Sequence, residues 1–540
     1  MKSQCLPFSQ IPHTTEIFTD FLSYSPKIQQ FYPHSPRFSD WFREESAALN
    51  YDSARRVRVC ATLERQNASW NAAPNTVANI ARMRVGAAAV VTGQQVGLFG
   101  GPLFSLFKAL TAVKLAEQAT AGGVDCVPVF WLATEDHDLE EVNHVFVPGA
   151  DGHLRAVVTS SVGAVNAPVG TIRFGAEIEE VIKTVAEALG ESEIISIVRD
   201  AYRPGETFGT GFARLFSRLL GGWGVILVDA SDPELHKIAA PIYRAAIEKA
   251  AQLDDALQAR GKSLEESGYH QQVKVTPSSS LLFMLRGEAR VPVHRHTGAI
   301  SGSPEFVAGE EKLTQGQLVE RIANAPQDFS PNVLLRPVVQ DYLLPTVAYV
   351  GGPAEIAYFA QATAVYEALL SKVTPVVPRF SATVLEPKLQ ALLERYNLRA
   401  TDVFHAPELL RETLAREAMP QALQKSFDNA ETVLKKSMET IRESLSSIDK
   451  TLVESSSTAE SKMLYQLNGL RSRAARAELR HSELLARHAE ILSNSIYPNK
   501  NLQERELAGI YFLARYGTEF LGELYHTMQT DCLDHQIISM

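Results

Sequence analysis

Polar residues with acid–base chemistry stand together directly after an apolar run at residues 126–133. Carboxylates that flank a histidine can raise its basicity or orient it as a general base. The same residue types can bind a divalent cation, but no second histidine at ligand spacing supports a metal site, so none is predicted. Helix capping by Asp138 and Glu141 is a further interpretation. We favour substrate binding or acid–base catalysis, with the catalytic candidates Glu135, Asp136 and His137 and the binding candidate Asp138.

A glycine-rich loop at residues 93–101 follows the apolar run 87–92 and precedes Pro102, which suits the first turn of a helix. Free N–H groups at a helix N-terminus attract phosphate or carboxylate, so the loop is a candidate anion site. Its spacing matches neither GxGxxG nor GxxxxGKS/T, which excludes a dinucleotide fingerprint and a P-loop. A turn whose glycines serve packing alone is the alternative. The binding candidates are Thr92, Gly93, Gln94, Gln95, Gly97, Gly100 and Gly101, and the catalytic candidate in the following helix is Lys108.

A second transition from strand to glycines lies at residues 349–353, and a helix is expected from there to about residue 370. A helix N-terminus at this point would face the same ligand as the first loop. A plain turn is an equally weighted alternative. The binding candidates in this segment are Gly351, Gly352 and Glu355.

The order of the expected elements explains how these segments could be positioned. A strand at 87–92, a helix at 102–121 and a strand at 126–133 form a βαβ unit, and such units build parallel sheets. The pattern returns at 224–229, at 349–353 and at 373–379. We therefore predict a doubly wound, Rossmann-like α/β core at residues 81–400, with insertions at about 145–215 and 255–330. A helical segment, 1–80, packs on it. Because parallel strands end at one edge, the three polar segments should converge.

The C-terminal part has a different periodicity. Apolar residues fall at heptad spacing at Leu434, Met438, Ile441, Leu445, Ile448 and Leu452. The spacing breaks at residues 453–458, where three serines favour a turn, and resumes out of phase to Ile491. This predicts an antiparallel helical hairpin at 408–495, with one continuous rod as the alternative. Residues 496–540 should return to the core as a helix at 507–525, and the exposed apolar edge of the hairpin favours a homodimer.

Composition excludes several classes of protein. A chain of 540 residues with 45% hydrophobic residues is too long for one core. Its formal net charge of −10 argues against a nucleic-acid partner. The N-terminus has no apolar signal region and no apolar stretch is long enough to span a membrane, so we expect a cytoplasmic protein. The four cysteines have neither disulfide-framework nor zinc spacing and are expected as free thiols: Cys5, Cys60, Cys126 and Cys532.

Several long motifs occur in one order: VTGQQVGLFGGPL at 91–103, FWLATEDHD at 130–138 with Asn143-His144, LRP at 335–337, and VGGPAEIAY at 350–358. Together they resemble the cysteine-adding family of bacillithiol biosynthesis over nearly the whole chain. The resemblance implies a core related to class I aminoacyl-tRNA synthetases and nucleotidylyltransferases, with inserted connecting segments and a coiled coil. It also implies cysteine and glucosaminyl malate as substrates. Its motifs add three binding candidates: Asn143, His144 and Arg336.

The implied reaction is the formation of a carbon–nitrogen bond by a ligase. Amide formation at neutral pH needs an activated carboxyl, and by analogy of fold ATP with Mg²⁺ would supply an acyl-adenylate. In one departure from the family pattern, Phe107 stands before Lys108 where a histidine is expected, and no KMSKS-like loop is found. A tRNA-acting synthetase is therefore disfavoured. A scaffold or sensor that binds a small anion is the alternative, but polar residues at three successive strand ends favour an enzyme.

Overall fold

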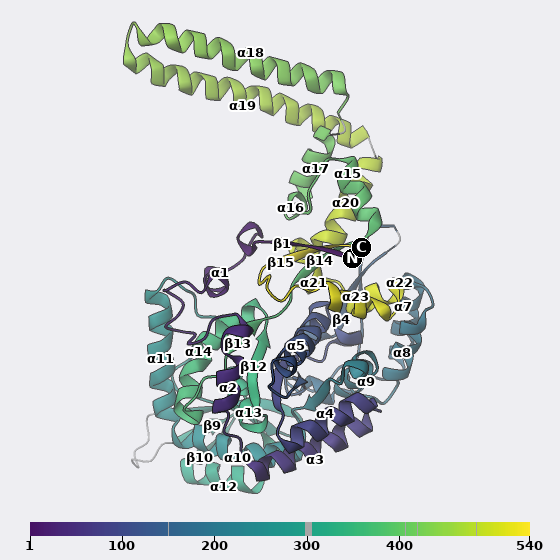
Figure 1. The fold of residues 1–540 in the computed structure, drawn as a ribbon, viewed down its shortest axis with the longest axis vertical. Coiled ribbons are helices and arrows are strands. Elements are labelled where there is room, and N and C mark those ends of the chain that lie inside the picture. The colour runs from purple at the N-terminus through teal and green to yellow at the C-terminus, as the bar shows by residue number, and fades with distance from the viewer. Residues whose placement is uncertain (150, 297–304, 406, 418, 482) are drawn as a thin grey trace.

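A five-stranded parallel sheet forms the centre of the protein (Figure 1). The structure is a computed structural model that describes residues 1–540 except 150, 297–304, 406, 418 and 482. The strand order is β13-β12-β2-β3-β6 and all neighbours are parallel, which confirms the doubly wound core. The chain order reverses between β2 and β12, so a topological switch point lies there. The strands are β2 (Ala88–Gln94), β3 (Cys126–Leu132), β6 (Ile226–Asp229), β12 (Thr346–Gly351) and β13 (Val376–Pro378).

Both faces of the sheet are buried, which explains why its strands are nearly continuous apolar runs. Val91 and Val129 join a hydrophobic core on one face, and Phe130 and Leu132 join another on the opposite face. The helices of the first core include α3 (Ser53–Ser69), α4 (Pro74–Val85), α10 (Pro233–Glu248), α13 (Arg336–Leu343) and α14 (Pro353–Leu370). The helices of the second include α5 (Phe104–Ala121) and α9 (Phe208–Leu220).

The N-terminal segment packs on this body through aromatic side chains. Phe18, Phe21, Phe31 and Tyr32 are buried in the first core. The first residues form an edge strand that the sequence pattern did not reveal. The elements ahead of α3 are β1 (Lys2–Leu6), α1 (Glu16–Ser23) and α2 (Phe42–Ala48).

Two insertions interrupt the sheet close to the expected positions. The first begins after α6 (Leu139–Val142) with an antiparallel hairpin and continues as helices. Its elements before α9 are β4 (His144–Pro148), β5 (Leu154–Val158), α7 (Glu177–Leu189) and α8 (Glu193–Ala201). The second is an antiparallel sheet of order β10-β9-β8-β7-β11. Its elements are α11 (Ala250–Glu266), β7 (Ser279–Arg286), β8 (Ala289–His296), β9 (Glu305–Ala308), β10 (Glu311–Thr314), α12 (Gln315–Asn324) and β11 (Phe329–Pro331).

A helical hairpin projects from the body, as predicted, but its turn is elsewhere (Figure 1). The helix α18 (Gln421–Ser446) ends before residues 447–449, and α19 (Lys450–His481) runs back beside it. Asp449 accepts a hydrogen bond from the Thr451 amide at 2.8 Å and so caps α19. The serines expected in the turn lie inside α19, where Ser456 donates to the Val453 carbonyl.

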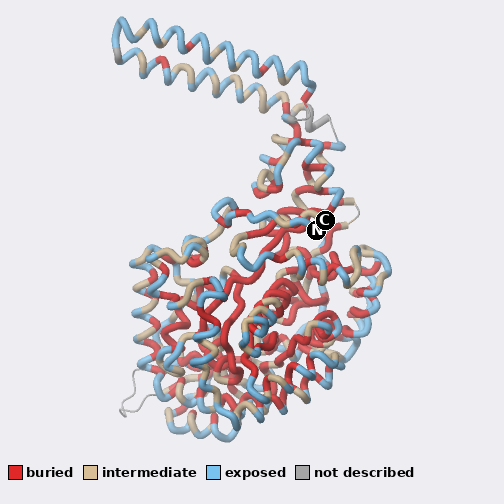
Figure 2. The backbone as a smooth tube through the Cα atoms, in the orientation of Figure 1, coloured by how far each residue is buried: buried red, intermediate tan, exposed pale blue. Residues whose placement is uncertain are grey.

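The hairpin is attached to the body by short helices. These are α15 (Pro387–Arg395), α16 (Ala400–Val403), α17 (Pro407–Glu417) and α20 (Glu483–Ile496). The heptad seam is only partly buried within the hairpin. Met438 is 6% exposed, but Ile441 and Ile448 are 47% and 73% exposed, and Figure 2 shows mostly exposed backbone along α18 and α19. One edge of the seam therefore lacks an intramolecular partner among the described residues.

The C-terminal segment returns to the body, but not as the single helix expected at 507–525. It forms α21 (Gln503–Glu506), α22 (Gly509–Tyr516), α23 (Glu519–Thr527) and a strand, β15 (His535–Ser539). Gly517 has φ +75°, a left-handed conformation that ends α22. The strand lies between β1 and β14 (Ala382–Leu385), so the two chain termini are side by side (Figure 1). No helix in the described ranges is long and apolar enough to cross a membrane.

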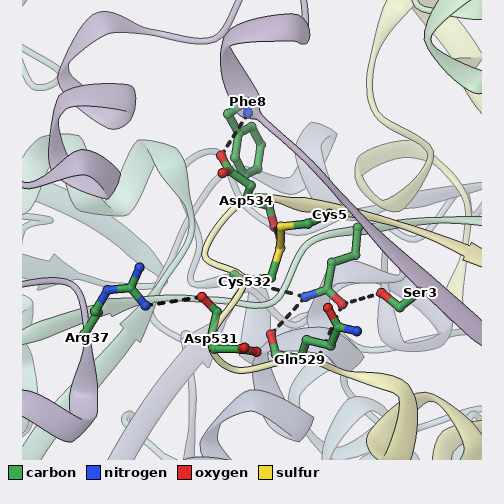
Figure 3. The surroundings of a disulfide bond; sticks show 9 residues. Ser3, Cys5, Phe8, Arg37, Gln529, Asp531, Cys532 and Asp534 are labelled. Atoms are coloured by element: carbon green, nitrogen blue, oxygen red, sulfur yellow. Dashed lines mark hydrogen bonds between the residues drawn. A yellow bond between two sulfur atoms is a disulfide. The ribbon is translucent and has the colours of Figure 1, made fainter.

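A disulfide bond joins the N-terminal strand to the segment before the C-terminal strand, which corrects the expectation of four free thiols. Cys5 on β1 pairs with Cys532, just before β15, with their Cα atoms 6.2 Å apart (Figure 3). The surrounding segment is held by further contacts, such as the hydrogen bond from the Phe8 amide to Asp534 at 2.9 Å. Sequence spacing cannot reveal a pairing across 527 residues. Cys60 and Cys126 are free and buried, and burial raises the pKa of each thiol, to about 11 and about 12.

The disulfide should stabilise the fold measurably, because it restricts the unfolded chain. Replacing Cys5 with Ser is expected to lower the free energy of unfolding by about 2–4 kcal/mol, measured by urea denaturation without reductant. Reductant should lower the midpoint of the wild type and leave that of the variant unchanged. A wild-type midpoint that reductant does not move would contradict the pairing.

Candidate active site

An ion pair crosses the switch point between β2 and β12. Lys108 extends from α5, which follows β2, and its ammonium pairs with the Glu355 carboxylate on α14, which follows β12. Lys108 Nζ also donates to the Gly93 carbonyl at 2.7 Å and to Gln94 Oε1 at 2.9 Å. The Lys108 side chain is 3% exposed and that of Glu355 is 18% exposed. Two predicted residues of the first loop, the predicted lysine of the following helix and one predicted residue of the second segment are thus joined by a single contact network.

Electrostatics keep this pair charged near neutral pH. Burial lowers the pKa of Lys108 to about 8, although Glu355 opposes the shift. Burial favours the protonated form of Glu355, but Lys108 and the hydrogen bonds to the carboxylate outweigh it, so the pKa of Glu355 is lowered. The Gly352 amide donates to Glu355 Oε2 at 2.8 Å and the Tyr349 hydroxyl donates to Oε1 at 2.6 Å. Both carboxylate oxygens are therefore occupied.

Arg336 extends the same network on the β12 side. Its guanidinium donates to Tyr358 Oη at 2.7 Å and to Gln340 Oε1 at 3.0 Å, and Tyr349 Oη lies 3.4 Å away. Burial alone would lower the pKa of Arg336, but the two tyrosines and Glu355 raise it. Arg336 therefore remains a fixed positive charge beside the ion pair.

Glu135 lies at the end of β3 in a second polar group. Its Oε1 is 3.3 Å from Nε2 of His236 on α10, and Nδ1 of His236 is 3.1 Å from the Tyr243 hydroxyl. His236 is 3% exposed, so this contact is sheltered from water. At the end of β6, Asp229 Oδ1 accepts hydrogen bonds from the hydroxyls of Thr134 at 2.6 Å and Ser231 at 2.8 Å. Burial raises the pKa of Asp229 despite these bonds.

Asp136 and His137 follow Glu135, and their side chains do not hydrogen-bond to each other. Their ring-to-carboxylate distance is 3.8 Å, too long for a hydrogen bond. Asp136 Oδ1 instead accepts from the His137 amide at 2.7 Å. His137 Nδ1 lies 3.4 Å from Arg290 Nη1, and because arginine can only donate, the neutral ring carries its proton on Nε2. Arg290, not a carboxylate, therefore orients the histidine.

The three predicted segments come together at the carboxyl edge of the sheet. Lys108 contacts the first loop and Glu355, and Gln95 Nε2 donates to Asp136 and to Glu141, at 2.8 Å each. The predicted convergence is confirmed. Asp138 lies nearby but accepts from the Glu141 amide at 3.2 Å, which is the capping interpretation. A group of three or more His, Cys, Asp or Glu able to hold a metal ion is absent from the residues described.

Four amides in and after the glycine loop are bonded within the protein and so are not free for the predicted anion site. The amides of Gly97, Gly100, Gly101 and Leu103 donate to carbonyl oxygens of the protein, the last to that of Leu507 at 2.8 Å. Gly100 and Gly101 have φ +89° and +69°, so they serve the tight turn. Side-chain cations, Lys108 and Arg336, lie at this edge as well.

Three further binding candidates have other contacts. Thr92 is buried and its hydroxyl donates to the Val350 carbonyl at 2.9 Å, which ties β2 to β12. Asn143 Oδ1 and His144 Nδ1 are 3.1 Å apart, and His144 pairs with Val158 in the β4–β5 hairpin. Thr92 therefore has a structural contact, and the Asn143–His144 pair belongs to the insertion rather than to the sheet edge.

Several polar residues of this edge were not predicted. Asp229 and His236 stand where a strand end and a helix start were expected, so the position of Asp229 was a usable signal. Arg290 comes from the insertion and Arg379 from the end of β13, and nothing in their local sequence marks them. A cavity of about 590 Å³ lies elsewhere, at the amino end of β12, where Thr346 contributes to its wall.

Two family models match the chain. One is described as "Bacillithiol biosynthesis BshC, N-terminal Rossmann-like domain" and matches residues 1–380. The other is described as "Bacillithiol biosynthesis BshC, C-terminal coiled-coil domain" and matches residues 382–540. This chain belongs to the BshC family of bacillithiol biosynthesis. The two models meet between β13 and β14, about 20 residues before the end that we expected for the core.

Relatives of the BshC family match the chain along its length. A protein of Koribacter versatilis is 46% identical over 538 residues, covering 100% of each chain. A protein of Solibacter usitatus is 36% identical over 540 residues, again covering 100% of each. A protein of Salinibacter ruber is 30% identical over 531 residues, covering 97% of this chain and 96% of its own. Each is named "Putative cysteine ligase BshC".

The lowered pKa of Lys108 predicts how stability depends on pH. The folded protein releases this proton at about pH 8 and the unfolded chain at about 10.5. Between these values the unfolded state binds more protons, so the stability of the fold rises with pH. Relative to Lys108→Met, the wild type should gain roughly 1–2 kcal/mol of unfolding free energy between about pH 7.5 and about pH 9.5. Urea unfolding of both proteins measures this; a constant or shrinking difference would show that burial does not depress the pKa.

Proposed function

We propose that this chain joins the carboxyl group of cysteine to the amine of glucosaminyl malate, as a ligase that forms a carbon–nitrogen bond. The observation that carries this is the placement of Lys108 and Arg336 on the same sheet edge as Asp136 and His137. Amide formation needs positive charge to bind and polarise a carboxyl derivative and a base to take the proton of the attacking amine. The names of the relatives support the same reaction.

More than one residue of the site could act as the general base. His137 and Asp136 are 37% and 35% exposed, so a substrate amine can reach both, whereas Glu135 is 14% exposed and occupied by His236. We propose His137 as the residue that takes the amine proton. Because Nε2 already carries the ring proton, the proton would go to Nδ1, where the amine would replace Arg290. Asp136, fixed by Gln95, would hold the ammonium form of the substrate before reaction. A small-anion scaffold would need no such group.

We further propose that ATP with Mg²⁺ activates the carboxyl group. In this route the cysteine carboxylate attacks the α-phosphorus and displaces pyrophosphate. The amine then displaces AMP from the acyl-adenylate, and one proton leaves with the base. Arg336 and Lys108 would stabilise the anionic groups through their positive charge, since the three N–H donors of Lys108 are taken by Gly93, Gln94 and Glu355. Phe107, which replaces the expected histidine, is fully buried against Phe380 with ring centroids 4.9 Å apart, so it contributes no contact to a nucleotide.

The direct test is mass spectrometry of the products after incubation with glucosaminyl malate and cysteine, with and without ATP. The proposal predicts the amide product, with AMP and pyrophosphate when ATP is present. His137→Ala should lower turnover by at least about 10²-fold, as loss of a general base usually does. His270→Ala is the matched control, because His270 is exposed and contacts Gln272. Full turnover by His137→Ala would refute its role as the base. Product formed without ATP would refute the adenylate route.

We also propose that the protein is cytoplasmic, where free cysteine and a nucleotide would be available, and that it forms a homodimer through the hairpin. Support for the dimer comes from apolar side chains left exposed on α18 and α19. Those on the first helix and the turn include Val433 at 57%, Ile441 at 47% and Ile448 at 73%, and Leu470 on the second is 57% exposed. Contact with a second copy would bury them, and two-fold symmetry is the commonest closed arrangement.

Sedimentation analysis tests this assembly. Ile441→Asp should shift the wild-type dimer toward monomer by more than about tenfold in dissociation constant, because it would bury an unpaired charge. Ser437→Asp is the control, since it adds the same charge at an exposed polar position of α18. A wild type that sediments as a monomer at tens of micromolar would refute the dimer, and equal effects of both substitutions would refute the assigned surface.

A further inference from the structure

The C-terminal domain places one arginine beside the sheet edge by means of two buried anchors. Gln503 Oε1 accepts from the Val384 amide at 2.8 Å, and its Nε2 donates to the Ser495 carbonyl at 2.6 Å. Glu504 Oε2 accepts from the Ala382 amide at 2.7 Å. Gln503 and Glu504 are at most 1% exposed. Arg505, the next residue, is exposed, and its position is set by these anchors.

The segment after Arg505 is bonded to the glycine loop. The Leu507 carbonyl accepts from the Leu103 amide at 2.8 Å, and the Gly509 amide donates to the Gly101 carbonyl at 3.2 Å. Arg505 therefore lies at the start of α5, where its guanidinium is 6.0 Å from the centre of the Phe104 ring. Lys108 and Arg379 approach the same ring at 5.8 and 5.2 Å. Three cationic side chains thus lie around the Phe104 ring.

Two of these three cations have a carboxylate partner and the third has none. Lys108 pairs with Glu355, and Arg379 pairs with the buried Glu504 at 2.5 Å. Within the described residues, Arg505 makes no side-chain hydrogen bond and no ion pair. Although Arg505 is exposed as a residue, partial enclosure of its guanidinium and the neighbouring Arg379 lower its pKa, and the carboxylates of Glu504, Glu506 and Glu141 oppose this shift without cancelling it.

The carboxylates near Arg505 are engaged by other residues. Glu506 accepts from the side-chain amides of Asn499 at 2.8 Å and Asn501 at 3.1 Å. Glu141 accepts from Gln95 at 2.8 Å. A guanidinium on an anchored backbone, next to other cations and without an ion pair of its own among the described residues, has the properties of a receptor for an external carboxylate.

We propose that Arg505 binds a carboxylate of the malyl group of the amine-bearing substrate, an inference that rests on the proposed function. The malyl carboxylates keep their charge through the reaction, whereas the carboxylate of cysteine is consumed. A permanent cation away from the base is suited to the group that does not react. The C-terminal domain would then supply a specificity-determining residue to a site on the Rossmann-like domain.

Steady-state kinetics of Arg505→Met tests the assignment. The KM for glucosaminyl malate should rise about 10- to 100-fold, the usual loss for a hydrogen-bonded charge, while kcat and the KM for cysteine stay within about twofold. Arg505→Lys should recover part of the affinity, since lysine keeps the charge but not the bidentate geometry. Lys500→Met, an exposed cation five residues earlier, is the matched control and should not change the KM.

A second substrate distinguishes a loss of carboxylate recognition from a general loss of catalytic activity. With methyl glucosaminide, which has the amine but no carboxylate, wild type and Arg505→Met should have the same kcat/KM. An equal loss with both substrates, or no loss with glucosaminyl malate, would overturn the assignment. Calorimetric titration with glucosaminyl malate measures binding without turnover. A wild type that binds the substrate but forms no amide would refute the proposed function. Unchanged affinity of Arg505→Met would refute the carboxylate subsite at Arg505.

Discussion

The buried ion pair between Lys108 and Glu355 is the interaction on which the rest of the site depends. Moving two charges out of water costs several kcal/mol, and the pair is tolerated because further hydrogen bonds satisfy it. Gly93, Gln94, Gly352 and Tyr349 provide these bonds, and they come from the ends of β2 and β12. The pair therefore fixes the two strands at which the sheet reverses, and with them the polar residues that follow.

A second buried pair ties the C-terminal domain to this arrangement. Arg379 ends β13, and its partner Glu504 belongs to the short helix that precedes the segment bonded to the glycine loop. That segment accepts a hydrogen bond from the Leu103 amide and donates one to the Gly101 carbonyl. The domains also meet in the terminal sheet, where β15 pairs with β1 of the first domain and with β14 of the second. The two domains are therefore joined at the sheet edge as well as in the terminal sheet.

The sequence was informative where local patterns determine structure. Apolar runs followed by glycines located β2 and β12, and an apolar run followed by acidic residues located β3. The rule that parallel strands end at one edge then placed Gln95, Asp136 and Glu355 at the same edge. It was uninformative where a contact joins distant segments. Arg290, Glu504 and the Cys5–Cys532 pair have no local signature, because each depends on how the insertion or the terminal strands fold back. The hairpin turn was misplaced because serines can bond to helix carbonyls as readily as they favour a turn.

A crystal structure of the protein with glucosaminyl malate would test the central claim most directly, namely that the carboxyl edge at the switch point is the catalytic site. The account predicts the sugar amine within about 3.5 Å of His137 or Asp136, a hydrogen-bonding distance, and a malyl carboxylate on Arg505. Binding of the substrate at the opposite edge instead, in the cavity beside Thr346 and the amino end of β12, would contradict it.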